Sequence, residues 1–150
     1  MDDAGDILIE CETRPQITLG VTRGAWRLLA ALGVAAAPEV CLPNGRRADL
    51  MGLGSKGQIV IVEVKSGAED FKADFKWQEY RPYCDQFYFA VAPEFPQSLL
   101  PEEPGLIVAD GFGGAVVREA AHAPLVPARR KALTLAFGRL TAMRAASLHI

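Results

Sequence analysis

The sequence has few of the residues that build disulfide frameworks, zinc sites or nucleophile triads. Its three cysteines, Cys11, Cys41 and Cys84, are an odd number without Cys-x-x-Cys spacing, so neither a disulfide framework nor a zinc site is indicated. The two histidines, His122 and His149, have no histidine four residues away. We therefore assign neither histidine a metal-binding or nucleophilic role.

Long apolar runs and phosphate-binding loops are also missing. The apolar run at residues 28–38 is eleven residues long, well short of the roughly 18 residues that a membrane helix needs. Residues 1–6 lack the basic start of a signal peptide. The glycine-rich residues 111–114 lack the Lys-Ser/Thr pair of a P-loop. Because neither a membrane helix nor a signal peptide is indicated, we expect a cytoplasmic protein that makes no contact with a membrane.

The composition favours one folded domain. Of the 150 residues, 50% are hydrophobic and 23% are charged, which suits a domain with its own core rather than a disordered chain. Five acids lie in the first twelve positions, so we predict a flexible acidic arm at residues 1–14 and a single domain at residues 15–150. The net charge of −2 speaks weakly against a nucleic-acid partner. Without those five acids, however, 13 acidic residues stand against 16 basic ones, which also fits an ordinary mixed surface.

The most informative stretch is a predicted β-hairpin. Strand-forming residues 48–53 and 58–64 flank a Gly-Ser-Lys-Gly cluster whose glycines suit a tight turn. The hairpin brings Asp49 close to Glu63, and strand alternation puts Glu63 and Lys65 on one face. Charged groups at the end of an apolar strand are costly to bury unless they are paired or bind a metal. The residues therefore allow two interpretations, a structural salt bridge or a metal site.

This stretch also resembles a known nuclease motif. Asp49, followed after about a dozen residues by Glu63-Val64-Lys65, resembles the metal site of the PD-(D/E)XK nuclease superfamily, with Ala48 where the pattern often has proline. Residues 63–91, with the segments 105–110 and 129–135, resemble the bacterial MmcB-type DNA repair family, a branch of that superfamily. The resemblance covers about residues 20–145.

The resemblance implies an α/β fold with a restriction-endonuclease-like core, in which helices flank a mixed sheet of four or five strands. It implies a Mg²⁺ or Mn²⁺ ion held by Asp49, Glu63 and the backbone carbonyl of Val64, with Glu39 as a further candidate ligand. Lys65 would orient the attacking water or stabilise developing negative charge. For Glu39 the alternative is an ordinary surface glutamate, and for Asp49 and Glu63 it is a salt bridge with Lys65 or Arg47.

The function implied is a metal-dependent DNA endonuclease that acts in repair, with DNA and other repair proteins as partners. One alternative is a catalytically silent module on a nuclease fold that binds DNA or recruits a repair protein. A second alternative, which only the overall acidity favours, is a protein-interaction domain that binds no nucleic acid. Nucleases of this superfamily often work as dimers, so a homodimer is also an expectation.

Several basic and aromatic residues are candidates for DNA contact, each with a simpler alternative. They are Arg23 and Arg27 on a predicted helix, Arg46 and Arg47 in a predicted turn, and Lys72, Lys76, Trp77 and Tyr80 on another predicted helix. The cations could meet phosphates, and the rings could stack on an exposed base. The alternatives are solvated arginines and core aromatics. Among the polar residues of the second helix, Lys72, Asp74 and Gln78 are further candidates for the site.

The remaining elements follow from periodicity and turn residues. We predict helices at residues 18–32, 68–83 and 128–147, strands at 38–42, 87–91, 106–109 and 115–118, and a short helical turn at 97–100. The first helix would bury Trp26, Leu28, Leu29 and Leu32 and stop at Gly33. The last would cover the sheet with Leu133, Phe137 and Leu140, leaving Arg130 and Lys131 for solvent or phosphate.

Overall fold

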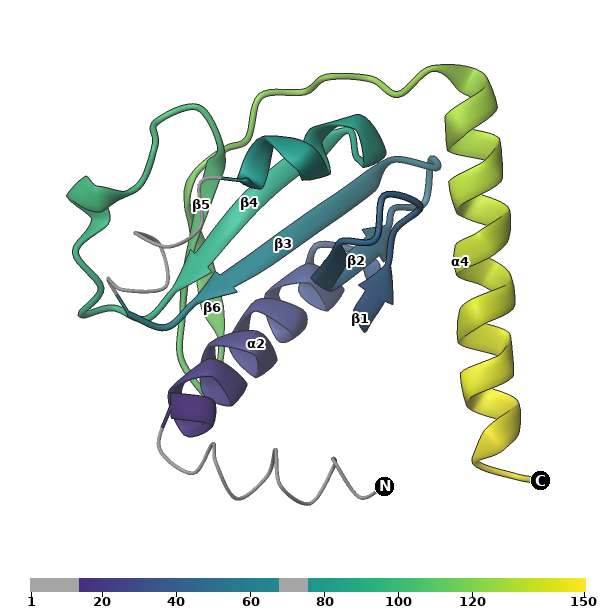
Figure 1. Cartoon of the computed structure of the whole chain (residues 1–150). Coiled ribbons are helices and arrows are strands. Elements are labelled where there is room, and N and C mark those ends of the chain that lie inside the picture. Colours follow the sequence, from purple (N-terminus) through teal and green to yellow (C-terminus); the bar gives the residue numbers. More distant parts are fainter. Residues whose placement is uncertain (1–13, 68–75) are drawn as a thin grey trace.

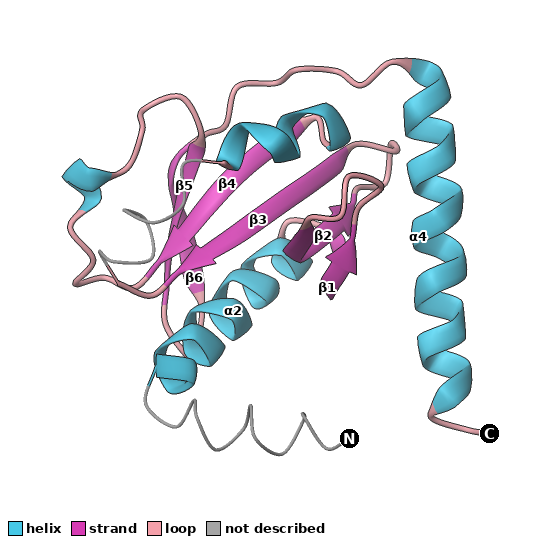
Figure 2. Cartoon of the chain, viewed as in Figure 1, coloured by secondary structure: helices cyan, strands magenta, loops and turns pink. Residues whose placement is uncertain are grey.

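The protein is described by a computed structural model, which covers residues 14–67 and 76–150. It has an α/β fold built on one six-stranded sheet with the strand order β1-β2-β3-β4-β5-β6 (Figures 1 and 2). The strands are β1 (Ala35–Cys41), β2 (Arg47–Leu53), β3 (Ile59–Lys65), β4 (Gln86–Val91), β5 (Gly105–Ala109) and β6 (Gly114–Arg118). The expected four or five strands are too few, because the two short strands β5 and β6 also join the sheet.

The sheet is mixed, as expected. Strands β1, β2 and β3 form an antiparallel meander, β3, β4 and β5 are parallel, and β6 returns antiparallel to β5. The predicted parallel pairing of β4 with β3 is therefore confirmed. Because β3, β4 and β5 run in one direction, their carboxyl ends lie at the same edge of the sheet.

Strand β3 lies inside the sheet, and its side chains alternate between two cores. Ile59 and Ile61 belong to one apolar cluster, whereas Val60, Val62 and Val64 belong to the other. Every residue of β3 is buried. The predicted alternation is therefore confirmed, and Glu63 and Lys65 share the parity of the two isoleucines.

Helix α2 (Arg14–Ala31) covers the valine side of β3 with Val21, Ala25 and Leu29. It ends before Gly33, whose φ of +81° fits the predicted stop. The predicted apolar stripe is only partly right, because Trp26 is 38% and Leu32 59% exposed. The physical reason is a close approach at Gly24, where an added Cβ would overlap the carbonyl oxygen of Asp110. This contact turns the small-residue side of α2 toward the sheet.

The isoleucine side of β3 is covered by the 3₁₀ helix η1 (Trp77–Tyr83) and by helix α4 (Pro127–Ser147). The predicted helix at residues 68–83 lies partly outside the described residues, and its described end is 3₁₀ rather than α. Pro82 lies inside η1 and has no N–H to donate, which disfavours a regular α-helix there. A second 3₁₀ helix, η2 (Gln97–Leu99), occupies the loop before β5. The predicted acidic arm, apart from Arg14, lies outside the described residues.

An ion pair between a buried aspartate and a partly exposed arginine fastens the start of α4 to the sheet. Asp85 is 2% exposed, and its two carboxylate oxygens accept hydrogen bonds of 2.7 and 2.6 Å from the Arg130 guanidinium. The same carboxylate accepts the backbone N–H groups of Ile59 and Leu125. Burial opposes its charge, but these donors outweigh burial and lower the pKa of Asp85 to about 2. The expectation that Arg130 faces solvent or phosphate is therefore wrong.

The core residues predicted for α4 are confirmed. Leu133 and Phe137 of α4 are buried in the core, and Leu140 packs against it, as predicted. Within residues 14–67 and 76–150, no helix has both the length and the apolar character needed to cross a membrane.

Candidate functional site

The two predicted carboxylates meet where the pairing of β2 with β3 ends. The ladder runs from Leu53 opposite Ile59 to Leu50 opposite Val62. Beyond it, the Asp49 N–H donates to the Glu63 carboxylate over 3.0 Å. The Val64 N–H in turn donates to the Asp49 carboxylate over 2.7 Å. Side-chain oxygens thus take the place of strand carbonyls as acceptors. The hairpin brings Asp49 and Glu63 together, as predicted, and we call these two residues the carboxylate pair.

The backbone carbonyl of Val64 belongs to the same place. In an extended strand the N–H and C=O of one residue point to the same edge. Because the Val64 N–H points to Asp49, its carbonyl oxygen also faces the β2 side rather than β4. Two carboxylates and one carbonyl therefore border the gap that opens between β2 and β3.

Burial makes the carboxylate pair hard to ionise. Glu63 is 6% exposed, and its burial, followed by the nearby charge of Asp49, raises the pKa of Glu63 to about 8. Burial also raises the pKa of Asp49, against the opposing effects of the Val64 N–H and of the charges of Lys65 and Arg47. Near neutral pH the metal-free pair therefore retains a proton, in the place where a cation would stabilise both charges.

Lys65 and Arg47 place positive charge beside the pair. Lys65 is 7% exposed and lies two residues after Glu63 on the same face of β3. Both cations favour the ionised form of Asp49. A structural ion-pair network and a metal site share this arrangement, so it supports either interpretation.

The donor set fits a hard divalent cation. Mg²⁺ prefers oxygen ligands and retains several waters, so two carboxylates and a carbonyl can hold it. Within the described residues, no cluster of three acidic, histidine or cysteine side chains could hold a metal. Glu39 accordingly does not join the pair as a third acid. It is an exposed residue of β1 with a φ of +52° and lines a hollow under α4.

Tyr80 and Trp77 do not have the predicted role in stacking on a base. Their side chains are 4% and 7% exposed, and each ring stacks on Phe87, at centroid distances of 5.5 and 5.8 Å. The alternative, that they are core aromatics, is correct. The Tyr80 hydroxyl instead reaches the site, where its single proton can be donated either to the Glu63 carboxylate or to the Arg47 carbonyl oxygen, which lies 3.3 Å away. No signal in the sequence distinguishes this role, because the contact depends on how η1 packs on β3.

The predicted DNA-contacting cations divide between the two faces of the sheet. Arg47 lies beside the carboxylate pair, and Arg46 pairs with Glu79 of η1 over 2.8 Å. Arg23 and Arg27 lie on α2, which covers the other face. Lys76 is exposed just before η1, whereas Lys72 and Asp74 are outside the described residues, and Gln78 is exposed on η1. Their roles in binding DNA stay predictions.

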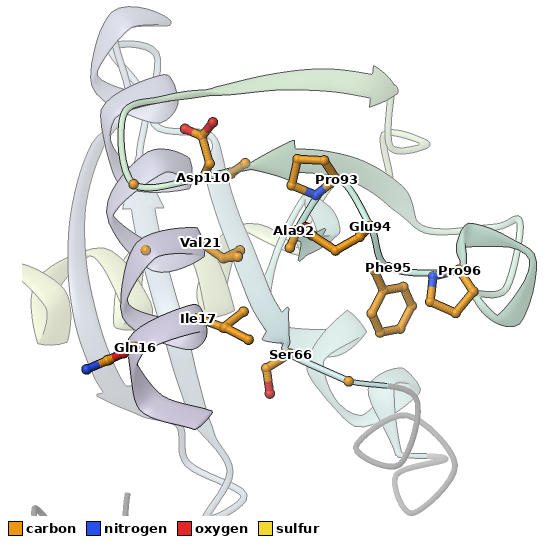
Figure 3. Close-up of a pocket in the computed structure, with 14 residues that line it drawn as sticks. Gln16, Ile17, Val21, Ser66, Ala92, Pro93, Glu94, Phe95, Pro96 and Asp110 are labelled. Carbon is orange, nitrogen blue, oxygen red and sulfur yellow. The ribbon is translucent and has the colours of Figure 1, made fainter. Parts of the chain in front are cut away.

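A cavity of about 560 Å³ adjoins this site without containing it (Figure 3). It lies at the carboxyl ends of β3, β4 and β5, between α2 and the loop after β4. Its lining begins at Ser66, directly after Lys65, and includes Ile17, Phe95 and Asp110. The cavity holds neither member of the carboxylate pair. The candidate site is therefore defined by the carboxylate pair rather than by this cavity.

The chain matches known proteins over nearly its whole length. A solved structure described as "SPO1766 protein of unknown function from Silicibacter pomeroyi" is 44% identical, with a TM-score of 0.84 over 89% of this chain and 91% of that chain. No curated protein matches the chain. Residues 6–150 match the family model described as DNA repair protein MmcB-like. The resemblance to that family is thereby confirmed, and the chain belongs to the MmcB-like DNA repair protein family.

Proposed function

We propose that the protein is a metal-dependent DNA endonuclease that hydrolyses phosphodiester bonds during repair, with a site of the PD-(D/E)XK type. The observation that carries the proposal is the carboxylate pair itself. Asp49 and Glu63 are held together by reciprocal hydrogen bonds to each other's strands, although burial disfavours their charges. An arrangement that costs stability in the free protein is typical of a site that binds a cation.

The chain's own residues would divide the work as follows. A bound Mg²⁺ or Mn²⁺ ion supplies polarisation of the phosphate and a lower pKa of an attached water. Asp49, Glu63 and the Val64 carbonyl would hold the ion. Lys65 shares the face of Glu63, and its ammonium group would orient the attacking water or stabilise developing negative charge. Tyr80 fixes the orientation of the Glu63 carboxylate through its hydroxyl.

Cleavage of a panel of single-stranded, duplex, flapped, mismatched and branched DNA with Mg²⁺ or Mn²⁺ tests the proposal. Glu63→Gln retains an oxygen that can accept the Asp49 N–H but removes the charge. We expect cleavage by the wild type and none above background by this variant. Glu39→Gln, which removes an exposed carboxylate from β1, is the matched control and should cleave normally.

A different result would favour the second candidate, a silent module that binds DNA or recruits a repair protein. The observation that favours this second candidate is the effect of the Lys65 and Arg47 charges on Asp49, which is equally expected of a structural ion-pair network. Wild-type protein that is folded and binds DNA without cleaving any substrate would replace the nuclease proposal with this one. Undiminished cleavage by folded Glu63→Gln would remove the carboxylate pair from the mechanism.

A further inference from the structure

The turn between β5 and β6 presents an exposed phenylalanine on a fixed backbone. The Asp110 N–H donates to the Gly113 carbonyl over 2.9 Å. The Asp110 carboxylate accepts the N–H groups of Phe112 and Gly113 over 2.9 and 3.1 Å. Phe112, the third residue of this turn, is 87% exposed. We name residues 110–113 the aromatic turn.

Helix α2 holds the aromatic turn from behind. Gly24 packs so closely that an added Cβ would overlap the Asp110 carbonyl oxygen. Arg27 donates from Nη1 to the Phe112 carbonyl oxygen over 3.2 Å. Because the backbone of the turn is already fixed, little conformational entropy would be lost when a partner covers the Phe112 ring. A single exposed apolar residue is common, but one held this firmly is suited to recognition.

Helix α2, which contacts the aromatic turn, has a cationic exposed side. Arg23 and Arg27 lie one helical turn apart on the exposed side of α2, and the helix contains no acidic residue. The acid of the aromatic turn, Asp110, is already engaged by two backbone N–H groups, which hold its pKa below the usual range. An exposed ring whose backbone is bonded to one arginine, with a second arginine one helical turn away, fits a nucleic-acid strand, since the ring can stack on a base while the cations meet phosphates.

The aromatic turn also lies at the edge of the sheet that carries the candidate site. Strand β5 is parallel to β3 with β4 between them, so their carboxyl ends are about 10 Å apart at the usual strand spacing. The cavity between them is lined by Ser66 from the end of β3 and by Asp110 and Gly111 from the aromatic turn (Figure 3). The carboxylate pair and α2 lie on opposite faces of the sheet. A DNA strand that passes around this edge from one face to the other would therefore run from the carboxylate pair to Phe112.

We propose that Phe112, Arg23 and Arg27 form a contact for an unpaired nucleotide that flanks the cleaved phosphate. The ring stacks on the base, and the arginines bind the adjoining phosphates. This inference rests on the proposed function and narrows its substrate class to DNA with a single-stranded segment next to the cleavage position. Fully paired duplex offers no free base face to the ring and should bind less well.

Binding measured without metal separates this contact from catalysis. Fluorescence anisotropy with labelled single-stranded and duplex DNA of equal length, in EDTA, gives both dissociation constants. We expect Phe112→Ala to weaken single-strand binding about tenfold, the contribution of one base-aromatic stack, and duplex binding less than about twofold. Leu135→Ala is the matched control, because Leu135 is 63% exposed on α4, away from this turn.

Two further variants test the chemistry of the contact. Phe112→Trp keeps a π-face and should bind single strands at least as well as the wild type, whereas Phe112→Leu keeps apolar area alone and should bind as poorly as Phe112→Ala. Arg23→Ala should reduce the slope of log affinity against log salt by about 0.7, as expected for one lost phosphate contact on a single strand.

Several results would overturn the inference. They are wild-type affinity of Phe112→Ala for single strands, full binding by Phe112→Leu, and a wild-type protein that binds no DNA. Cleavage assays with Mg²⁺ keep the two proposals apart. Binding that depends on Phe112 without any cleavage supports this contact and refutes the nuclease, whereas cleavage with binding that is indifferent to Phe112 does the reverse.

Discussion

The buried carboxylate pair predicts that the metal-free protein loses stability as the pH rises. The pKa of Glu63 is raised from 4.5 to about 8 in the folded protein. Below pH 4.5 both the folded and the unfolded chain hold this proton. Between these two pH values the unfolded chain has released it and the folded chain has not, so the free energy of unfolding falls as the pH rises. The raised pKa of Asp49 acts in the same direction.

The magnitude follows from the same difference. A shift from 4.5 to about 8 corresponds to at most about 5 kcal/mol, and entry of water at the end of the β2–β3 ladder will reduce it. Urea unfolding of wild type and Glu63→Gln between about pH 5 and pH 9 measures this contribution together with the accompanying change at Asp49, whose pKa is coupled to Glu63. We expect the stability of the variant relative to wild type to rise by roughly 2–4 kcal/mol across this range.

Metal should reverse the effect. A cation that binds only the folded state stabilises it by about 1.4 kcal/mol for each tenfold excess over its dissociation constant. Mg²⁺ at about pH 8 should therefore stabilise the wild type and leave Glu63→Gln unchanged. Parallel pH profiles for the two proteins would refute the reasoning, since they would show that Glu63 does not titrate differently in the folded and unfolded chains.

Three other perturbations test separate parts of the structure. Tyr80→Phe keeps the packing on Phe87 and should lower the free energy of unfolding by about 1 kcal/mol or less. It should nevertheless weaken Mg²⁺ affinity, measured by calorimetry, about tenfold or more; unchanged affinity would remove Tyr80 from the site. Asp85→Asn should cost about 3 kcal/mol in urea unfolding because it leaves Arg130 without its charged partner. In wild type the stability that ionised Asp85 provides is fully present above pH 3.8 and is lost as the pH falls through about 2. A variant as stable as wild type at pH 7 would contradict the stabilising role of the pair between Asp85 and Arg130. Gly24→Ala should lower the thermal midpoint, whereas Gly138→Ala, in open space on α4, should raise stability by up to about 1 kcal/mol.

The parts of the fold with local sequence signals were predictable. The glycine cluster between two strand-forming runs predicted the β2–β3 hairpin, and alternation along β3 then placed Glu63 and Lys65 on one face. From these two signals the proximity of Asp49 to Glu63 followed without any structure. Expectations of this kind are reliable because the side-chain period of a strand is fixed by its backbone.

The parts that depend on contacts between distant elements were not predictable. Asp85 and Arg130 are 45 residues apart, and neither residue has a local pattern that marks it as half of a buried pair. Trp26 has the right spacing for a buried stripe, but the close contact at Gly24 decides which side of α2 faces the sheet. Such outcomes are set by packing between elements rather than by periodicity within one of them.

The kink at Glu39 has a consequence for how the protein behaves at high concentration. Consecutive carbonyls of a regular strand point to opposite edges, but Glu39 has a φ of +52°, and the Arg144 guanidinium donates to the carbonyl oxygens of both Pro38 and Glu39, over 2.6 and 2.7 Å. These two carbonyls are therefore already occupied within the chain. Pro38 also lacks an N–H. The outer edge of the sheet at β1 therefore offers no continuous row of pairing groups. Growth of the sheet by addition of another molecule's strand is blocked at this edge, which protects concentrated protein against ordered aggregation and disfavours a homodimer built by β1–β1 pairing.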